Sequence, residues 1–275
     1  MTVGYCDNLI YDVGMHTGQD TAYYLFKGYD VIAIEANPAL VRKAESRFRE
    51  AIADGQLQIL HIGIAAEPGE ADFFISTKKS VWSSFDKANA TKDGSGFKIC
   101  RLRCTPFHNI LRQYGVPHYL KVDIEGNDHL CLDALEVECL PQYISVEMSH
   151  QGGGEAIRHL KELGYTGFKF ARQNDLTVLE PDRLPAYLES RRQAAVHSLR
   201  GHIARRTNNL WLRVRRPRHA GWVFPKGASG PFGEDLPGRW TDAAEATRTW
   251  KALTDADLTL SGAALGDWFD IHATR

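Results

Sequence analysis

Short apolar runs alternate with longer amphipathic segments along the first half of the chain. The apolar runs predict buried strands at residues 9–13, 31–34, 57–62, 119–124 and 143–148. The amphipathic segments predict helices at residues 18–28, 38–52, 106–114, 128–135 and 155–163. Strands and helices that alternate in this way form a parallel sheet with helices on both faces. The pattern therefore predicts an α/β fold with a mostly parallel central sheet.

Local signals support these boundaries. Asn37-Pro38 and Thr105-Pro106 each place a capping side chain before a proline, which is well tolerated at the first helical position. Gly164 is predicted to end the last of these helices. Residues 71–75 have the pattern of a hairpin arm.

The second half of the chain is less regular, and its composition differs. The regular alternation stops near residues 168–170, and the tail from Thr241 predicts one or two short polar helices. Residues 191–219 contain nine arginines and no Lys, Asp or Glu, which leaves 24 basic residues against 34 acidic ones elsewhere. We therefore expect a core at residues 1–182, an arginine-rich helical insertion at 183–220, and a C-terminal extension at 221–275 packed on the core.

The overall composition is that of an ordinary globular chain. Its 275 residues are 43% hydrophobic and 24% charged, which excludes a mostly disordered protein. No apolar run approaches the roughly 20 residues of a membrane span, and we see no signal peptide at the start. The five cysteines are odd in number and form no Cys-x-x-Cys pair, which is typical of reduced thiols. We therefore expect a cytoplasmic enzyme.

Charge is unevenly distributed, although the net charge is only −1. A balance this close to zero argues against a generic DNA-binding protein. The arginine-rich segment can pair with the acidic remainder, recognise an anionic acceptor, or lie on an anionic membrane surface. Arginine favours bidentate recognition of phosphate or carboxylate. We expect Arg205 and Arg206 to bind substrate.

A glycine-containing turn follows the first predicted strand. Asp12 begins the sequence Asp-Val-Gly-Met-His-Thr-Gly, and Glu35 stands 23 residues further on, at the end of the second strand. An acidic side chain in that position can accept hydrogen bonds from both ribose hydroxyls. A dinucleotide site would need glycine where His16 stands. The spacing favours S-adenosylmethionine, which has no pyrophosphate to hold.

The fourth predicted strand carries a second polar group. Alternation along residues 119–124 places Lys121, Asp123 and Glu125 on one face. Ligands of open α/β sheets lie beyond the carboxyl ends of the strands, so Asp123 and Glu125 point toward the predicted crevice. The alternative is a cluster of lysine and carboxylates that satisfy one another at the strand end.

These motifs together resemble the FkbM family of S-adenosylmethionine-dependent methyltransferases. That family has Asp-Val-Gly-x-x-x-Gly, Glu-x-Asn-Pro and Leu-Lys-(Ile/Val)-Asp-(Ile/Val)-Glu-Gly in this order, and the chain matches them at residues 12–18, 35–38 and 120–126. Ser83-Ser84 and residues 144–147 also resemble family features. The resemblance implies a Rossmann-like class I methyltransferase fold and O-methylation of sugar, glycolipid or polyketide hydroxyls. His16 departs from the asparagine that the family commonly has.

The resemblance also implies roles for individual residues. Gly14, Gly18 and the helix start are expected to hold the amino-acid end of the cofactor, with Asp12 and His16 in the same site. We expect Glu35 and Ala36 at the ribose, Gly63 and Ile64 at the adenine, and Asp123 nearest the reacting methyl group. Ser83, Ser84 and Glu125 are expected to contact the substrate. Residues 229–233 resemble a C-terminal extension found in part of the family.

Three interpretations remain open for His150, which follows the fifth predicted strand. It can be a general base, because its ordinary pKa lies near neutral pH. It can instead join Asp123 and Glu147 around a divalent cation that orients a substrate hydroxyl. The third interpretation is a polar loop residue without a catalytic role. A hydrolase is not indicated, because Ser83 and Ser84 have no histidine or acid at triad spacing.

Two other classes of function fit parts of the sequence. One is a non-catalytic module that binds S-adenosylmethionine or a nucleotide and uses its arginines to bind RNA. The other is an NAD-dependent oxidoreductase. For the methyltransferase we expect a small-molecule or saccharide acceptor, which can be anionic, no DNA partner and no transmembrane segment; a homodimer is compatible with the sequence.

Overall fold

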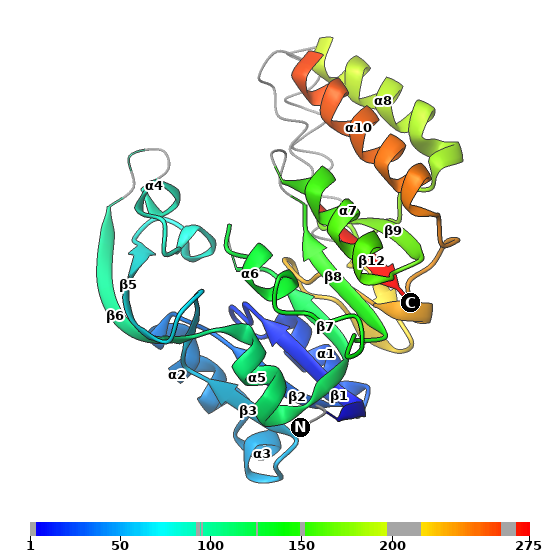
Figure 1. The fold of residues 1–275 in the computed structure, drawn as a ribbon. Helices are drawn as coiled ribbons and strands as arrows, with labels where there is room; N and C mark the ends of the chain where they lie inside the picture. The colour runs from blue at the N-terminus through cyan, green and yellow to red at the C-terminus, as the bar shows by residue number, and fades with distance from the viewer. Residues whose placement is uncertain are drawn as a thin grey trace. The chain divides into compact units, whose positions relative to one another are not determined.

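The computed structural model describes residues 4–91, 94, 96–124, 126–148, 152–196, 216–259 and 268–275. They belong to two compact units, Met1–Val146 and Glu147–Arg275 (Figure 1). The boundary that we expected at residue 182 lies inside the second unit.

A parallel sheet organises the first unit. Its strands are β1 (Tyr5–Val13), β2 (Asp30–Ile34), β3 (Leu57–Leu60), β7 (Val116–Val122) and β8 (Tyr143–Glu147), in the order β3-β2-β1-β7-β8. Each neighbouring pair is parallel, so the predicted strands and their parallel arrangement are confirmed. Strand β1 has β2 on one side and β7 on the other. Ligands of open α/β sheets bind at such a reversal of winding, beyond the carboxyl ends of the strands.

A helix is present at each position predicted in the first unit, although the helix predicted at 128–135 covers only four residues. The helices at these positions are α1 (Gln19–Phe26), α2 (Pro38–Arg47), α3 (Arg49–Ala53), α5 (Phe107–Tyr114) and α6 (His129–Leu132). Asn37 caps α2 as predicted, because its side chain accepts a hydrogen bond from the N–H of Ala39 at 3.0 Å. The single helix predicted at 38–52 is instead divided at Phe48, whose φ of −106° and ψ of 26° are not helical.

The predicted cap at Thr105 is wrong. Pro106 is the N-cap of α5, and it makes no side-chain hydrogen bond there. Thr105 is the last residue of strand β6 (Phe97–Thr105), and its hydroxyl accepts a hydrogen bond from the Asn109 side chain at 3.1 Å. The strand therefore continues up to the proline, which is consistent with the extended backbone that proline imposes on the residue before it.

A three-stranded arm extends the first unit between β3 and α5. Its strands are β4 (Gly63–Ile64), β6 and β5 (Gly69–Ser76), in the order β4-β6-β5. Strands β5 and β6 pair antiparallel, which confirms the hairpin arm predicted at 71–75. The arm also contains the one-turn helices η1 (Ser80–Trp82) and α4 (Lys87–Ala90). Figure 1 shows β5 and β6 as a long curved ribbon.

The second unit mixes helices with short strands. It contains α7 (Gly153–Leu163), β9 (Gly167–Arg172), η3 (Pro181–Arg183), α8 (Leu184–Val196), β10 (Arg218–His219), β11 (Trp222–Val223), η4 (Gly233–Asp235), α10 (Ala243–Thr259) and β12 (Phe269–Thr274). Strands β9 and β12 pair antiparallel, with His272 opposite Lys169. Gly164 ends α7 with a φ of 108°, as predicted.

Several expectations for the second half need correction. Residues 168–170 lie within strand β9, where we expected the regular structure to stop. The described part of the tail contains a 17-residue helix, α10, and the strand β12. Within the arginine-rich segment, α8 is helical as expected, whereas residues 218–219 form a strand that pairs with β11. Residues 197–215, including Arg205 and Arg206, lie outside the described residues.

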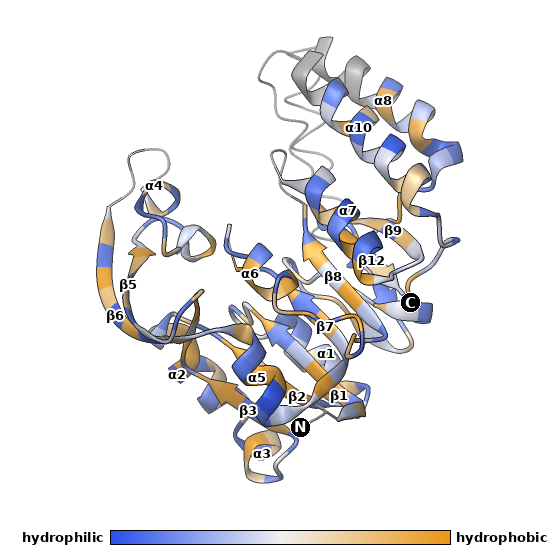
Figure 2. Cartoon of the chain, in the orientation of Figure 1, coloured by the Kyte–Doolittle hydropathy of each residue, from blue (hydrophilic) through white to orange (hydrophobic). Residues whose placement is uncertain are grey.

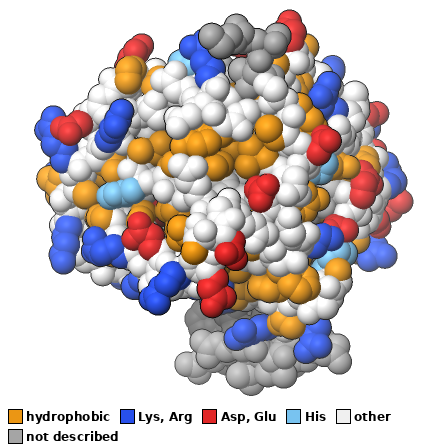
Figure 3. Space-filling model, turned by 90° about the horizontal axis from the view of Figure 1, so that it is seen from below, with side chains coloured by type: hydrophobic (Ala, Val, Ile, Leu, Met, Phe, Trp, Pro, Cys, Tyr) orange, Lys and Arg blue, Asp and Glu red, His pale blue; other side chains and the backbone are white. Residues whose placement is uncertain are grey.

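Apolar side chains fill the interior of both units. On β1, Ile10, Tyr11 and Val13 are completely buried, as expected for a strand of a parallel sheet. In the coloured parts of α8 and α10, polar and apolar residues follow one another (Figure 2). On the face drawn in Figure 3, acidic and basic side chains are interspersed, in keeping with the near-zero net charge. None of the helices that the structure describes is long and apolar enough to span a membrane.

Candidate active site

The turn after β1 is tight and unusual in its backbone. Gly14, His16 and Gly18 all have positive φ angles, of 87°, 53° and 72°. The N–H groups of Gly14 and Met15 both donate to the carbonyl of Ile34 at 3.0 Å. Helix α1 starts directly after Gly18, so the first N–H groups of that helix face the carboxyl end of the sheet. This is the arrangement by which helix starts hold anionic groups.

The two glycines allow other parts of the chain to approach the turn. A Cβ on Gly14 would lie 1.8 Å from the carbonyl oxygen of Asp123, and one on Gly18 would lie 2.5 Å from the ring of Phe48. The space beside both glycines is filled by protein, so the glycines allow the turn to pack against the residues that directly follow β7 and α2.

Glu35 lies directly after β2 and faces the same turn. Its carboxylate accepts hydrogen bonds from the N–H of His16 at 2.8 Å and the N–H of Asn37 at 2.7 Å. The residue is 8% exposed. Burial raises the pKa of Glu35 to about 7, although the main-chain hydrogen bonds act in the opposite direction. No ion pair of the described residues involves Glu35, and each carboxylate oxygen can accept a further hydrogen bond.

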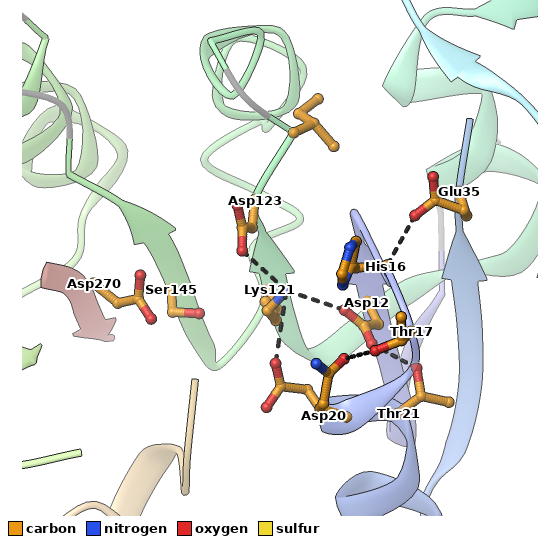
Figure 4. A network of polar contacts seen from close by, with 12 residues as sticks. Asp12, His16, Thr17, Asp20, Thr21, Glu35, Lys121, Asp123, Ser145 and Asp270 are labelled. Atoms are coloured by element: carbon orange, nitrogen blue, oxygen red, sulfur yellow. Dashed lines mark hydrogen bonds and ion pairs between the residues drawn. The ribbon is translucent and has the colours of Figure 1, made fainter. Parts of the chain in front are cut away.

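A buried lysine holds three carboxylates at the end of β7 (Figure 4). The Nζ atom of Lys121 lies 3.3 Å from Asp12, 3.8 Å from Asp20 and 3.6 Å from Asp123. Thr21 donates a hydrogen bond to the second oxygen of Asp12 at 2.5 Å. Asp12 and Asp20 are buried, whereas the Asp123 side chain is 32% exposed. The cluster that we considered as an alternative is therefore present, and Asp123 is its accessible end.

His16 connects the turn to the arm. Its Nε2 atom is hydrogen-bonded to the hydroxyl of Ser80 at 2.8 Å. The imidazole is half-buried; burial lowers its pKa, and the carboxylate of Asp123 acts in the opposite direction. Its main-chain N–H is the donor to Glu35. The side chain and the backbone of His16 therefore face Ser80 and Glu35 respectively.

A family model describes more than half of the chain. The Methyltransferase FkbM domain matches residues 12–166, which span the turn, Glu35 and the Lys121 cluster. The chain belongs to the FkbM methyltransferase family. The positive φ of His16 also fits the asparagine that the resemblance led us to expect there, because asparagine and histidine adopt this conformation more readily than most residues.

Comparison with solved structures gives distant matches. Precorrin-6y C5,15-methyltransferase from Geobacter metallireducens GS-15 is 13% identical, with 60% of this chain and 67% of that chain covered and a TM-score of 0.36. The MccD protein is 8% identical, with 98% and 90% covered and a TM-score of 0.38. Phosphoethanolamine N-methyltransferase 2 from Haemonchus contortus is 10% identical, with 100% and 49% covered and a TM-score of 0.32. A search of curated proteins found no match.

The other residues of this FkbM chain that we expect to bind the cofactor lie close to the ends of β2 and β3. Ala36 follows Glu35, and its carbonyl is hydrogen-bonded to Nε2 of His61 at 3.3 Å. Gly63 and Ile64 form β4 and are buried. A Cβ on Gly63 would lie 2.3 Å from the ring of Phe85, so this glycine also serves packing. Adenine binding at these residues stays a prediction.

Ser83 and Ser84, which we expected to contact substrate, are buried and hold main-chain groups. The Ser83 hydroxyl accepts a hydrogen bond from the N–H of Ser76 at 3.2 Å, and that of Ser84 accepts one from Asp86 at 3.1 Å. Substrate contact by their hydroxyls stays a prediction. Glu125 lies outside the described residues.

Asp128 is a residue that the sequence analysis missed. Its carboxylate accepts hydrogen bonds from the N–H groups of Ile124 at 2.9 Å and Gly126 at 3.2 Å. Burial raises its pKa. Asp128 therefore holds the loop that follows Asp123. An aspartate a few residues after a strand, beside a glycine, is the signal that could have indicated this turn.

The metal interpretation depends on a residue that lies outside the described part of the chain. Glu147 is half-buried at the end of β8, and His150 lies outside the described residues. Within the part of the chain that the structure describes, no group of three His, Cys, Asp or Glu side chains is arranged to hold a metal ion. The three interpretations of His150 stay predictions.

Proposed function

We propose that this chain is an S-adenosylmethionine-dependent O-methyltransferase that acts on a hydroxyl of a sugar, glycolipid or polyketide-type natural product. Family membership supports methyl transfer. The observation that carries the cofactor assignment is Glu35, a buried carboxylate at the end of β2 whose hydrogen bonds come from main-chain N–H groups. Burying a carboxylate without a cation is costly, and the ribose hydroxyls of this cofactor would supply two further donors.

Each part of the site would hold one part of the cofactor, which supplies an electrophilic methyl group on a sulfonium centre. Glu35 would accept hydrogen bonds from the ribose. The turn at residues 14–18 and the first N–H groups of α1 would hold the carboxylate of the amino-acid end. The single cation of the Lys121 cluster faces three carboxylates, so the site favours a positively charged ligand.

Asp123 is the residue that we propose to act nearest the reacting groups. It is the accessible carboxylate of the cluster, and its Oδ2 atom lies 3.6 Å from Nζ of Lys121. This ion pair orients the carboxylate. Asp123 can accept a hydrogen bond from the ammonium group of the cofactor, or it can orient the acceptor hydroxyl and take up its proton. Methyl transfer is an in-line displacement, for which positioning and proton removal are the main contributions of the protein.

The test is turnover with an acceptor pool. The protein is incubated with S-adenosylmethionine and cell extract, S-adenosylhomocysteine is quantified, and mass spectrometry identifies products that have gained one methylene group. We expect Asp123→Asn to reduce the rate by roughly 100-fold with an unchanged unfolding midpoint. The matched control is Asp72→Asn, an exposed aspartate on β5, which should leave the rate unchanged.

Other outcomes would favour the alternatives. Binding of S-adenosylmethionine without turnover in any extract favours the non-catalytic module. Binding of NAD in preference to S-adenosylmethionine favours the oxidoreductase. Loss of activity in excess EDTA would favour the metal interpretation of Asp123, Glu147 and His150.

A further inference from the structure

The turn η1 is attached directly to the proposed cofactor turn. Ser80 begins η1, and its hydroxyl is hydrogen-bonded to Nε2 of His16 at 2.8 Å. The main-chain N–H of His16 donates a hydrogen bond to the carboxylate of Glu35. The residues around η1 therefore lie next to the turn that we propose to hold the cofactor, within the same compact unit.

Buried groups on either side hold η1 in place. Ser84 and Phe74 exchange two main-chain hydrogen bonds, of 2.9 and 3.1 Å. The Ser83 hydroxyl accepts the N–H of Ser76 at 3.2 Å, which closes the loop that contains η1. Because these partners belong to β5 or adjoin it, the turn is a fixed part of the arm. A prearranged turn loses little conformational freedom when it binds a ligand.

The two lysines directly before η1 both lie near the ring of Trp82. The Nζ atom of Lys79 lies 4.2 Å from the centroid of the Trp82 ring, and that of Lys78 lies 6.0 Å from it. Both lysines are exposed, and Trp82 is half-buried. No carboxylate among the described residues forms an ion pair with either lysine. On the same arm, Arg101 does have such a partner, Glu70 at 2.9 Å.

An aromatic ring beside two ammonium groups that have no carboxylate partner among the described residues suits a particular ligand chemistry. The apolar face of a sugar ring can stack on an indole, and a phosphate or carboxylate on that sugar can bind both lysines. The contact between Lys79 and Trp82 is a weak one at an exposed site, so an anion can draw the ammonium group away at small cost. A neutral acceptor could stack on the Trp82 ring but would give the two lysines no counterion.

We propose that Lys78, Lys79 and Trp82 form the acceptor-recognition site and that the acceptor is an anionic sugar. This inference rests on the proposed function, because it places the acceptor beside the cofactor turn. In this proposal Ser83 and Ser84 do not contact the acceptor. Their hydrogen bonds to β5 hold η1 in position. The two lysines also provide an anion site that is independent of Arg205 and Arg206.

Binding measured without cofactor and without turnover tests this inference separately. The full-length protein is titrated with glucose 6-phosphate, glucuronate, glucose and inorganic phosphate, and binding is followed by calorimetry and by ligand-observed NMR at millimolar concentrations. We expect the two anionic sugars to bind more tightly than glucose or phosphate, and their affinity to fall as salt is added. Glucose 6-phosphate and glucuronate together distinguish phosphate from carboxylate as the preferred anion.

Variants then locate the site. The double variant Lys78→Gln/Lys79→Gln should weaken binding of the anionic sugars by about fivefold or more, which is the effect of losing charge-assisted hydrogen bonds. Trp82→Leu should weaken the binding of the sugars but leave that of inorganic phosphate unchanged. Lys87→Gln is the matched control, because Lys87 is an exposed lysine whose Nζ lies 5.0 Å from the Phe97 ring on the same arm. It should bind like the wild type.

Two results would overturn the inference. One is the absence of binding of both anionic sugars to the wild type. The other is equal affinity in the wild type and the double lysine variant, with unfolding midpoints that show both to be folded. Lysine-dependent binding without any turnover of S-adenosylmethionine would uphold the recognition site and count against the proposed function. Turnover of a neutral acceptor, with a KM that the lysine variants do not change, would uphold the proposed function and count against the recognition site.

Discussion

The main-chain carbonyl of Asp123 lies where a side chain on residue 14 would have to be. A Cβ on Gly14 would approach the Asp123 oxygen to 1.8 Å, and the φ of Gly14 is +87°. The turn that begins the proposed cofactor site is thus packed against the strand end that carries the proposed reacting carboxylate. The position of Asp123 and the shape of the turn depend on one another.

Gly14→Ala should therefore destabilise the protein strongly. The new methyl group meets main chain, which cannot move aside as a flexible side chain can, so we expect a loss of about 3 kcal/mol or more in the free energy of unfolding. Urea denaturation, followed by circular dichroism, measures this change in the free energy of unfolding. Gly28→Ala is the control, because Gly28 has a φ of +89° but no atom within 4 Å of its Cβ position. Equal losses in the two variants would show that only the backbone angle matters.

Removing the cation of the Lys121 cluster should also destabilise the fold. Lys121→Met leaves Asp12 and Asp20 buried without a counterion, which costs about 3–5 kcal/mol in comparable cases. Adding Asp12→Asn to this variant should restore part of the loss, since the amide oxygen can still accept the hydrogen bond from Thr21. The urea midpoints of the single and double variants measure how much stability is restored. A double variant no more stable than Lys121→Met would contradict this account.

The strands of the parallel sheet could be predicted because their sequences are mostly apolar. Leu9 to Val13 and Val31 to Ile34 are buried on both faces, so a run of apolar residues marks them even though Asp12 stands within the first. Strands β9 and β12 were missed for the opposite reason. Lys169 and His272 are buried within them, and these polar residues interrupt the apolar pattern. Their pairing also joins segments about 100 residues apart, which no local pattern reveals.

The candidate site was predictable as a set of motifs and less so as a set of contacts. Asp12, Gly14, Glu35 and Asp123 are brought together because parallel strands end at the same edge of the sheet. Alternation along β7 placed Lys121 on the crevice face, but its burial between Asp12 and Asp20 depends on the packing of α1. The roles of Ser80 and Asp128 depend on hydrogen bonds to main-chain and side-chain groups of folded turns, which residue type does not specify.

Glu35 should make cofactor affinity depend on pH. In the cofactor-free protein the pKa of Glu35 is about 7, so the carboxyl is largely protonated below that pH. Ribose hydroxyl donors favour the ionised form, and affinity for S-adenosylmethionine should therefore rise as the pH increases through 7 and then level off. Calorimetry between pH 5.5 and 8.5 measures this. Glu35→Ala should lose about 1.5–3 kcal/mol of binding free energy at high pH.

Glu35→Gln separates charge from hydrogen bonding at this position. The amide keeps one acceptor oxygen but does not titrate, so its affinity for S-adenosylmethionine should be weaker than that of the wild type and independent of pH near 7. If the variant shows the same rise in affinity with pH as the wild type, another group is responsible for the titration. An unchanged dissociation constant in Glu35→Ala would remove Glu35 from the cofactor site.

His272 should make the protein sensitive to acid. It is buried on β12 opposite Lys169, and neither of its ring nitrogens has a hydrogen-bond partner among the described residues. Burial, and to a smaller extent the Lys169 cation, lower its pKa from 6.5 to about 3. Between these two values the unfolded chain binds a proton that the folded chain does not, so stability is present above pH 6.5 and is lost as the pH falls toward 3. The slope attributable to this group is at most about 1.4 kcal/mol per pH unit.

His272→Leu tests this by removing both the titration and the unpartnered nitrogens. At pH 7.5 the variant should be at least as stable as the wild type, because replacing buried polar atoms that lack partners by an apolar side chain removes a desolvation cost. Between pH 6.5 and 4 its urea midpoint should fall less steeply than that of the wild type. His61→Leu is the control, since His61 is exposed and meets solvent in both states. Parallel decreases in the wild type and His272→Leu would mean that other groups cause the acid sensitivity.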